Sequence, residues 1–538
     1  MTWTIHLPQQ IVLLALVIAL VGGTLIRAPR AWAGVALGAL LAAAGALAAG
    51  LARGDIPPTE RFPAALVCLA IVVGLPHVLA AFEWQRRGDV SAEYFGLSLT
   101  GVFGLMLAAT ANDLVLLALA CELVAVPGYL LAYQSARTGR AATAESRAMT
   151  ASRARHDEDV LLKLLLPGVL SSLLSWFGFA LLSVSAGTTE IAGIAAALAN
   201  AARASGESAS AAGGSPLVLL AMGTIFVAAA LRMAAVPFHF GLADVFDRIG
   251  FAEGGWLSAA PRLVGWIVLA KVALAALPGH ETACLTLAGV LAAATLVGAG
   301  VLALAQTRLR PLLGYAAMGQ GGLALAGLAA AFAEARLAPP GVPLRSAILG
   351  GFHTSLFHLA GFLLMAGGLA AILCYFDRAR RPVEHVEDLA GWARDEPLAG
   401  TCGAVLLIGL AGLPLLPGFW ARLFLASSLL SVEPEWLGDW SGAFQPGLLV
   451  LAGALLVGCA LLAAAYLRVA AALIVERPLA RPRPAGGRPA LAAGILATLL
   501  AVGIGLMPGP LLEWIVAAKP QSTSTFDAKT SRPQRNAK

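Results

Sequence analysis

Charged residues are scarce in this chain of 538 residues. Lys, Arg, Asp and Glu together make up 12% of it, whereas hydrophobic residues make up 59%, and the mean hydropathy is +0.82. A soluble domain carries about 25% charged residues, so this chain has too little polar surface to face water on all sides. The composition excludes an ordinary soluble globular protein and indicates that lipid is its main solvent.

Cysteine and the motifs of soluble catalysts are equally sparse. The six cysteines form no CxxC pair and most lie in apolar runs, which predicts packing residues rather than an iron–sulfur cluster or a structural zinc site. The sequence contains no GxxxxGK[ST], no GxGxxG turn after a strand and no zinc-type histidine motif. The loops are too short for a soluble catalytic domain. Chemistry on a soluble substrate therefore has to belong to partner proteins.

Long apolar runs fill the chain instead. A bilayer core of about 30 Å needs roughly 20 helical residues, and runs of this order predict an all-α integral membrane protein with about 14 transmembrane helices. Residues 1–10 lack the basic region of a signal peptide, so the first run is expected to remain as a span. The predicted spans are 9–26, 31–51, 63–82, 92–111, 114–134, 159–185, 216–240, 255–277, 282–305, 311–333, 346–376, 398–430, 446–475 and 489–516.

Proline interrupts two of the predicted spans, the seventh at Pro237 and the twelfth at Pro414 and Pro417. Broken helices are tolerated at membrane depth where they line a cavity, and transporters place ion sites there. A kink without a functional role is the alternative. Outside the membrane we expect a polar loop over 137–157 and an amphipathic helical piece around 191–204.

Arginine in the predicted loops is distributed unevenly. Most loop arginines fall in the odd-numbered loops, counted by the span that each loop follows. Positive loops face the cytoplasm, so this alternation predicts both termini on the outer side of the membrane.

Several ionisable residues lie within or at the edges of the predicted spans. Glu122 lies in the middle of the fifth span, where a charge costs roughly 2.5–3.5 kcal/mol, so ion movement is the default hypothesis for it. Asp159 and Lys163 share a face of the sixth helix, either as a structural pair or with Lys163 beside Glu122 as a charge pair. Lys271 and Arg468, which lie nearer to span ends, are expected to extend to the interface.

The remaining candidates in the predicted spans are histidines and arginines. His239 follows the break at Pro237, where water could enter. A lone histidine in a membrane helix is more often a hydrogen-bonded packing residue, but it can also carry a proton. The other candidates in spans are Arg232, Arg262, His353, His358 and Arg422.

Several segments resemble one membrane protein family. Residues 111–133 (ANDLVLLALACELVAVPGYLLAY), 159–182 (DVLLKLLLPGVLSSLLSWFGFALL) and 231–246 (LRMAAVPFHFGLADVF) are similar, in this order, to the antiporter-like subunits of bacterial NADH–quinone oxidoreductase (respiratory complex I), and most of all to its N subunits. RLRPLLGYAAMGQGGLALAGL, AGLPLLPGFWARLFLA and AAYLRVAAALIVERP follow in the same order. The resemblance covers roughly residues 90–480.

This resemblance implies two inverted five-helix repeats with broken helices 7 and 12, and a proton path through Glu122, Lys163, Arg232, Arg262 and Arg422. The family usually has lysine where this chain has these three arginines, and histidine where it has Gln320. Arginine stays charged even when buried, so the arginines are expected to act as fixed charges, or the second half of the path has lost conduction. The candidate path as a whole comprises Glu122, Asp159, Lys163, Arg232, His239, Arg262, Gln320, His353, His358 and Arg422.

The resemblance also implies partners, location and chain organisation. It predicts a hetero-oligomer with other membrane subunits in the bacterial inner membrane, with NADH, flavin, iron–sulfur clusters and quinone bound by partner subunits and no cofactor or metal in this chain. The expected regions are 1–90 (three helices), 91–480 (a core with repeats 91–277 and 282–475), 481–516 (a last helix) and 517–538 (a disordered tail). A cation/proton antiporter or membrane-bound hydrogenase subunit, and a non-conducting scaffold, are the alternatives.

Overall fold

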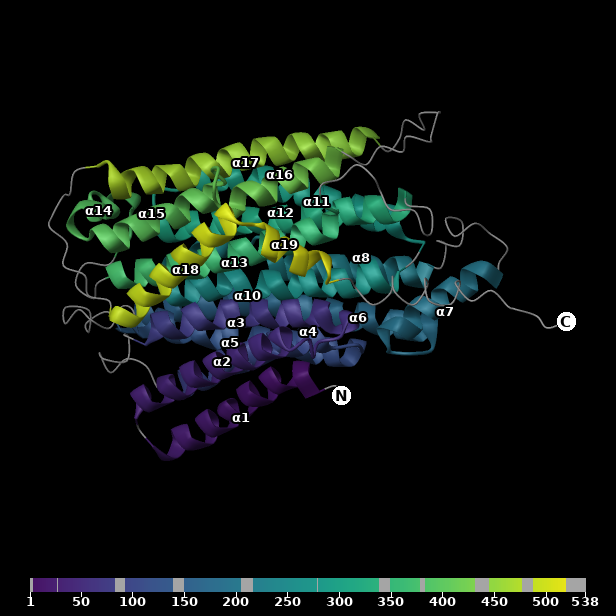
Figure 1. Cartoon of the computed structure of the whole chain (residues 1–538), viewed down its shortest axis with the longest axis horizontal. Helices are drawn as coiled ribbons and strands as arrows, with labels where there is room; N and C mark the ends of the chain where they lie inside the picture. Colours follow the sequence, from purple (N-terminus) through teal and green to yellow (C-terminus); the bar gives the residue numbers. More distant parts are fainter. Residues whose placement is uncertain are drawn as a thin grey trace.

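Each predicted span contains a helix in the computed structural model (Figure 1). The structure describes residues 3–26, 28–82, 92–138, 150–204, 216–277, 279–337, 349–377, 383–430, 445–476 and 487–518. The longer helices are α1 (Trp3–Leu25), α2 (Pro29–Ala52), α3 (Arg61–Ala81), α4 (Ala92–Thr110), α5 (Leu114–Thr138), α6 (Thr150–Ala186), α7 (Ile191–Ala204), α8 (Pro216–Met233), α10 (Phe251–Val268), α11 (Glu281–Ala305), α12 (Leu309–Leu337), α13 (Gly351–Phe376), α15 (Pro397–Ala411), α16 (Pro417–Leu430), α17 (Gln445–Ile474) and α18 (Arg488–Leu506). Shorter elements are α9 (Leu242–Arg248), α14 (Trp392–Asp395), α19 (Gly509–Val516) and a π-helical turn after α10 (Leu269–Leu274).

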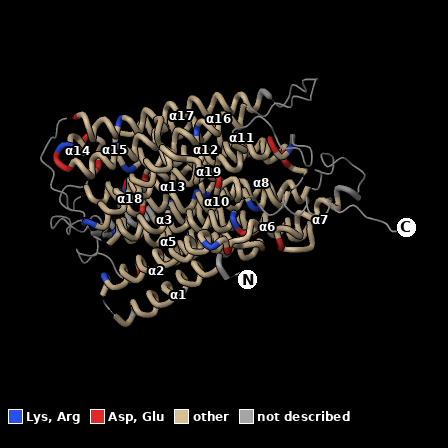
Figure 2. Tube along the Cα trace, in the orientation of Figure 1, with Lys and Arg blue, Asp and Glu red and all other residues tan. Residues whose placement is uncertain are grey.

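Thirteen of the described helices are long and apolar enough to cross a membrane. The remaining predicted span, 398–430, is made of two shorter helices, α15 and α16. Charged residues gather at the two ends of the bundle and only a few lie between them (Figure 2). The predicted all-α fold with about 14 crossings is confirmed, because helix length and charge placement both match the thickness of a bilayer.

The centre of the bundle is formed by α12 and α10. The membrane-spanning window of α12 is 100% buried and that of α10 is 89% buried, whereas that of α6 is only 22% buried. Residues on α10 and α12 are therefore shielded from lipid by their neighbours. All six cysteines are free, and four of them are buried, as expected for packing residues.

Both predicted helix breaks are present. The helix α8 ends at Met233 and the chain resumes as the short α9, while α15 ends at Ala411 and α16 begins at Pro417. Ala234 in the first break and Leu415 in the second have positive φ angles of 53° and 71°, which non-glycine residues rarely adopt. At each break the backbone therefore leaves the helical path within the bundle.

Two predicted boundaries were wrong. The last span, expected to continue over 489–516, is split into α18 and α19, because Pro508 and Pro510 cannot continue a helix and the residue before a proline favours an extended backbone. The polar loop expected over 137–157 is shorter than predicted, because α6 already begins at Thr150. The amphipathic helix expected around 191–204 is confirmed as α7.

Lys271 and Arg468 bind helix ends inside the protein. Lys271 Nζ donates to the carbonyl oxygens of Ala109 and Ala111 at 2.7 Å, at the end of α4. Arg468 Nη1 donates to the Leu304 carbonyl at 3.0 Å, at the end of α11. The last carbonyls of a helix have no partner within it and favour a cation. Both side chains are therefore held by helix ends within the protein.

The two caps belong to a pattern that occurs twice. A group of five crossings, α4, α5, α6, α8 and α10, is followed by α11, α12, α13, the α15–α16 pair and α17. In each group the fourth crossing is broken and the fifth helix or its continuation caps the first. Because five is an odd number of crossings, the second group enters the membrane from the opposite face. The described helices thus form two inverted repeats.

Isolated β-bridges mark matching places in the two groups. Asp113 pairs with Glu190, and Arg308 pairs with His385, both in antiparallel geometry. Each bridge joins the residue before the second helix of its group to the segment after the third helix. The first bridge is further tied by Thr189 Oγ1, which donates to Asp113. Partial burial would raise the pKa of Asp113, but the Thr189 bond and two backbone N–H bonds hold it below its usual value.

Candidate functional site

Glu122 in the middle of α5 faces the last turn of α8. Arg232 Nη2 donates to Glu122 Oε1 at 3.3 Å and to Ser172 Oγ at 3.4 Å, and Arg232 Nη1 donates to the Cys121 carbonyl at 3.4 Å. The Arg232 side chain is 5% exposed and that of Glu122 is 30% exposed. A lone charge at this depth is costly, so each of the two residues stabilises the charge of the other. Two residues of the predicted path therefore meet here.

Lys163 pairs with an acid other than Glu122. Its ammonium donates to Asp244 of α9, and no ion pair with Glu122 forms. The break after α8 brings the chain back across α6, where Gly241 has a φ of 70° and a Cβ added to it would stand 3.2 Å from the Cβ of Lys163. Glycine thus permits both the left-handed backbone and the close approach. The side chain of Asp159 lies outside the described residues.

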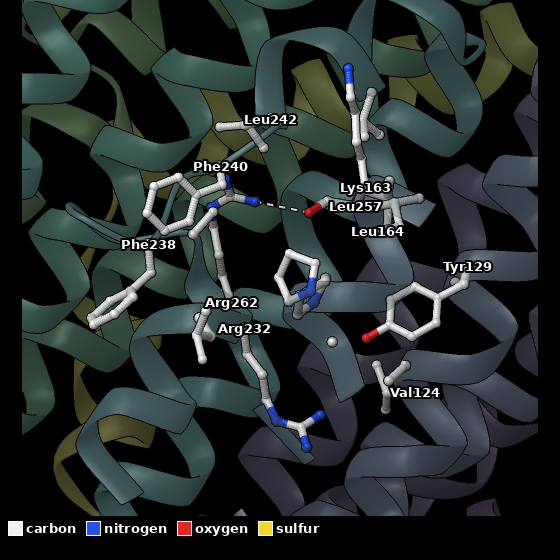
Figure 3. A pocket seen from close by; sticks show the side chains of 18 of the residues that line it. Val124, Tyr129, Lys163, Leu164, Arg232, Phe238, Phe240, Leu242, Leu257 and Arg262 are labelled. Carbon is white, nitrogen blue, oxygen red and sulfur yellow. Dashed lines mark hydrogen bonds between the residues drawn. The ribbon is translucent and has the colours of Figure 1, made fainter. Parts of the chain in front are cut away.

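A cavity of about 100 Å³ lies between these two ion pairs. Its polar lining includes Lys163, Arg232, Arg262 and Tyr129, and aromatic side chains such as Phe238 complete the wall. In Figure 3 the charged ends of Lys163 and Arg232 point in opposite directions, and the guanidinium of Arg262 is bound to the backbone of Leu257. A site needs roughly 10–15 Å³ per water molecule, so this cavity has room for several.

Arg262 is almost wholly buried, with 1% of its surface exposed. Its Nη1 donates to the carbonyls of Leu257 at 2.8 Å and Ser258 at 2.9 Å. Pro261 has no N–H to give to the Leu257 carbonyl one turn earlier, so the arginine replaces that missing donor. Among the described residues, Arg262 Nε and Nη2 have no hydrogen-bond partner. The side chain lies against Gly321 of α12, within 3.5 Å of a Cβ placed there.

The second group holds a matching centre at its own break. Gln320 Nε2 donates to the Leu410 carbonyl at 3.2 Å, and Arg422 Nη2 donates to the same oxygen at 2.7 Å. His358 Nε2 lies 2.9 Å from the backbone oxygen of Gln320. Leu410 is in the last turn of α15, where the break removes the donors that would continue the helix. A cavity of about 10 Å³ borders Gln320, His358 and Arg422, enough for one water molecule at most.

The two remaining candidate histidines, His239 and His353, do not line either cavity. His239 follows the first break, with its ring stacked on Phe240 at 6.3 Å and edge-on to Tyr315 at 6.4 Å. His353 lies in the first turn of α13, where a Cβ added to Gly350 would contact both His353 and Glu334. His239 thus lies beside the first break but is not among the residues that line the first cavity, and His353 is not among those that line the second.

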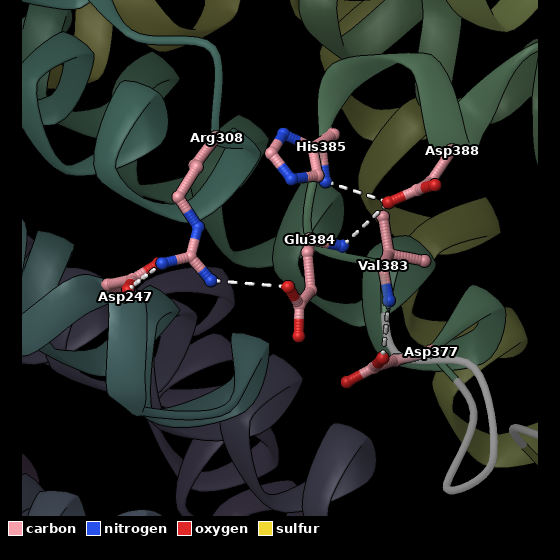
Figure 4. Close-up of polar contacts among 7 residues, drawn as sticks. All are labelled: Asp247, Arg308, Asp377, Val383, Glu384, His385 and Asp388. Atoms are coloured by element: carbon pink, nitrogen blue, oxygen red, sulfur yellow. Dashed lines mark hydrogen bonds and ion pairs between the residues drawn. The ribbon is translucent and has the colours of Figure 1, made fainter.

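An arginine outside the predicted path joins the two groups. Arg308 at the start of α12 binds Asp247 of α9, and its Nη2 donates to Glu384 Oε2 at 3.2 Å. The segment that carries Glu384 is itself held, because the backbone N–H groups of Glu384 and His385 both donate to Asp388 Oδ2 (Figure 4). The segment after the first break is therefore anchored to the second group.

Sequence reasoning missed three acids that matter here. Asp244 and Asp247 lie in GLADVFD, just after the first break, and two acids so close to a helix break were a signal. Glu253 precedes the eighth predicted span, which begins at residue 255, whereas α10 begins at Phe251 and Glu253 is 4% exposed. The apolar and small residues on both sides of Glu253 were the signal for burial.

Comparison with known proteins adds an independent result. The family described as "NADH:quinone oxidoreductase/Mrp antiporter, TM" matches residues 111–339 and 340–440. The chain is similar to NADH-quinone oxidoreductase subunit N 1 of Acidiphilium cryptum, with 29% identity over 69% of this chain and 68% of the relative. It is also similar to NAD(P)H-quinone oxidoreductase subunit 2 of a Synechococcus species, with 28% identity over 95% of this chain and 89% of the relative.

Solved structures share the fold. A chain of respiratory complex I from Thermus thermophilus superposes with a TM-score of 0.69 at 23% identity, covering 95% of this chain and 100% of that one. A chain of the Mrp complex from a Dietzia species superposes with a TM-score of 0.76 at 18% identity, covering 98% and 99%. At these identities the likeness concerns the fold alone.

Proposed function

Because this chain belongs to the NADH:quinone oxidoreductase/Mrp antiporter family of transmembrane proteins, we propose that it is a proton-translocating membrane subunit of an NADH–quinone oxidoreductase. In this role it couples quinone reduction elsewhere in a multi-subunit complex to proton movement across the membrane. The curated relatives quoted above are named as subunits of such enzymes. The redox groups belong to the partner subunits, and this chain contributes no cofactor.

The observation that carries the proposal is the Glu122–Arg232 ion pair at the first break. In this pair a carboxylate lies beside a fixed positive charge, and the arginine also lines a cavity with room for water. A chain that only filled the membrane could use apolar residues here without the cost of burying charge. The proposed path starts at this pair, includes Lys163 and Arg262, and reaches Gln320, His358 and Arg422.

A second candidate is a subunit of a cation/proton antiporter. The description of the matching family also names the Mrp antiporter, whereas the curated relatives quoted above favour the quinone oxidoreductase. Genes for quinone-reductase subunits beside this one support the first candidate, and genes for antiporter subunits support the second.

The test is proton uptake during NADH oxidation by the reconstituted complex. Glu122→Gln keeps the size of the side chain but removes the charge that cycles, so we expect an assembled complex with strongly reduced proton transport. Glu122→Asp should be milder because the carboxylate remains. Glu513→Gln, the same change at an exposed position of α19, is the matched control. Full pumping by an assembled Glu122→Gln complex contradicts the proposal.

The proposed topology places both termini on the outer face, with a core of inverted repeats over about 91–277 and 282–475. The start of α1 and the helix α7 lie at one end of the bundle and α14 lies at the other (Figure 1). A thiol introduced at Ala201 of α7 should react with an impermeant reagent from outside, and one at Arg394 of α14 should not. The reverse labelling pattern contradicts this orientation.

A further inference from the structure

A buried acid outside both centres lies in the first turn of α10. Glu253 is 4% exposed and is surrounded by α3, α4 and α5. Tyr94 Oη donates to Glu253 Oε1 at 2.6 Å, and Ser135 Oγ donates to Glu253 Oε2 at 2.8 Å. Among the described residues no lysine or arginine forms an ion pair with this carboxylate. A buried charge without a paired cation is expensive, and here two hydroxyl groups compensate it.

A histidine completes the cluster on the other side of Tyr94. His77 of α3 is also 4% exposed. Its Nδ1 lies 3.2 Å from the Ala252 carbonyl, and because a carbonyl can only accept, Nδ1 carries the hydrogen. In neutral His77 the Nε2 atom is then the acceptor. It lies 3.1 Å from Ser98 Oγ and 3.4 Å from Tyr94 Oη.

The Tyr94 hydroxyl can serve either neighbour. When Glu253 is ionised and His77 neutral, the hydroxyl donates to Glu253. When Glu253 holds a proton, that proton can be donated to Tyr94 Oη, and the hydroxyl then turns to His77 Nε2. When the proton is on His77 instead, Nε2 donates to Tyr94, which donates to ionised Glu253. The hydrogen bonds that link Glu253, Tyr94 and His77 are thus satisfied with one added proton at either end of this chain of three groups.

We propose that Glu253, Tyr94 and His77 form a buried proton-binding site that takes up one proton from water and shares it through the Tyr94 hydroxyl. In the part of the chain that the structure describes, the titratable groups of neighbouring helices that face Glu253 are these two and Cys374 of α13. From α5 the contact is made by Ser135. Beyond Cys374 lies an ion pair in which Arg310 Nη2 donates to Asp377 Oδ2 at 3.0 Å.

The site is adjacent to the first cavity but separate from it. The ring of Trp256, one turn after Glu253, lies 5.2 Å from the ring of His77 and also lines the cavity that contains Arg232 and Arg262. Ser135 also accepts a hydrogen bond from the backbone N–H of Gly250 at 2.8 Å, so the same cluster fixes the junction between α9 and α10. The proposal does not depend on pumping, because it concerns where a proton is bound.

Infrared difference spectra of the purified complex across a pH titration, recorded without NADH, test the site. A protonated carboxyl group gives its own carbonyl band, and we expect wild type to show one band that Glu253→Gln lacks. Glu93→Gln, an exposed acid next to Tyr94, should retain the band. Tyr94→Phe should keep it at a shifted frequency, because the carboxyl group loses a hydrogen bond.

Three results overturn the proposal. Superimposable spectra of wild type and Glu253→Gln mean that Glu253 stays ionised and only clamps the helices. Loss of the same band in Glu93→Gln assigns it to another residue, and an unchanged frequency in Tyr94→Phe removes Tyr94 from the site. If Glu253→Gln does not fold, the band frequency in Tyr94→Phe tests the proposal, because a shift supports it and an unchanged frequency contradicts it. A failed pumping assay with Glu122→Gln leaves these readings unaffected.

Discussion

The break after α8 and the break between α15 and α16 occupy equivalent positions, yet they are bordered by different charges. At the first break, Arg232 pairs with Glu122 and Lys163 pairs with Asp244, beside a cavity of about 100 Å³. At the second break, Arg422 and Gln320 share a backbone carbonyl beside a cavity of about 10 Å³. Among the described residues, Arg422 forms no ion pair with an acid.

This difference separates two kinds of electrostatic site on one scaffold. A carboxylic acid group is titratable, whereas arginine keeps its charge. The first break therefore has a carboxylate, that of Glu122, beside its arginine, and the second has the permanent cation Arg422 beside His358. Two interpretations of the second break follow. Either Arg422 acts as a fixed charge that orders water and tunes the neighbouring path, or the second half no longer conducts. We favour the fixed charge, because an unneeded buried arginine is costly to keep.

Removing the arginine at each break should produce the largest contrast in stability. Arg232→Ala leaves Glu122 without its partner, and we expect the free energy of unfolding to fall by roughly 2 kcal/mol. This is less than the 3–5 kcal/mol typical of a fully buried pair, because Glu122 is 30% exposed. Arg422→Ala leaves no carboxylate behind and should cost about 1 kcal/mol, the value of a hydrogen bond.

Denaturant unfolding of the purified complex measures both effects. The double variant Arg232→Ala with Glu122→Gln should recover part of the loss, because the stranded charge is gone. Equal losses for the two arginines, or no recovery in the double variant, contradict the described difference between the breaks.

The rate of proton uptake during NADH oxidation should distinguish the two interpretations of the second break. If Arg422 is a fixed charge, Arg422→Lys should preserve pumping, whereas Arg422→Ala should slow it roughly threefold to tenfold, the effect of about 1 kcal/mol on a rate. The measurement uses reconstituted complex, with unfolding data to confirm that each variant is assembled. Equal pumping by wild type and both variants means that the second half is silent.

Removing the Arg308 contacts that link the two groups of helices should have the smallest effect on stability. Arg308→Gln breaks its contacts with Asp247 and Glu384, and because Arg308 is 38% exposed we expect a loss of no more than about 1 kcal/mol. Arg53→Gln, which breaks the Arg53–Asp55 pair with the arginine 65% exposed, is the matched control and should change stability by nearly zero. If Arg53→Gln lowers the free energy of unfolding as much as Arg308→Gln does, the Arg308 contacts have no special role.

Local sequence was sufficient for most of the fold. The length of an apolar run sets whether a helix can cross a bilayer, and proline removes a donor wherever it stands, so the crossings and both breaks could be predicted. The same rule applied to Pro508 and Pro510 would have predicted the end of α18. Boundaries such as the start of α6 were less certain, because polar residues can continue a helix beyond the membrane.

Charge partners could not be predicted in the same way. Lys163, Arg232 and Arg262 line one cavity, and Glu122 pairs with Arg232. Which acid pairs with which base depends on how the chain turns after α8. Gly241 lets that turn pass close to Lys163, so Asp244 rather than Glu122 becomes its partner. Their roles in proton transfer remain predictions for the variants above.

The sequence by itself determined that this chain lies in a membrane, where its helices cross and where two of them break, because these properties follow from apolar length and from proline at single positions. Only the tertiary structure decided what each charge meets. Lys271 caps a helix 160 residues away along the chain, and Glu253 is buried against Tyr94 and Ser135 from two other helices. Such contacts depend on distances between segments remote in sequence, and no local pattern encodes these distances.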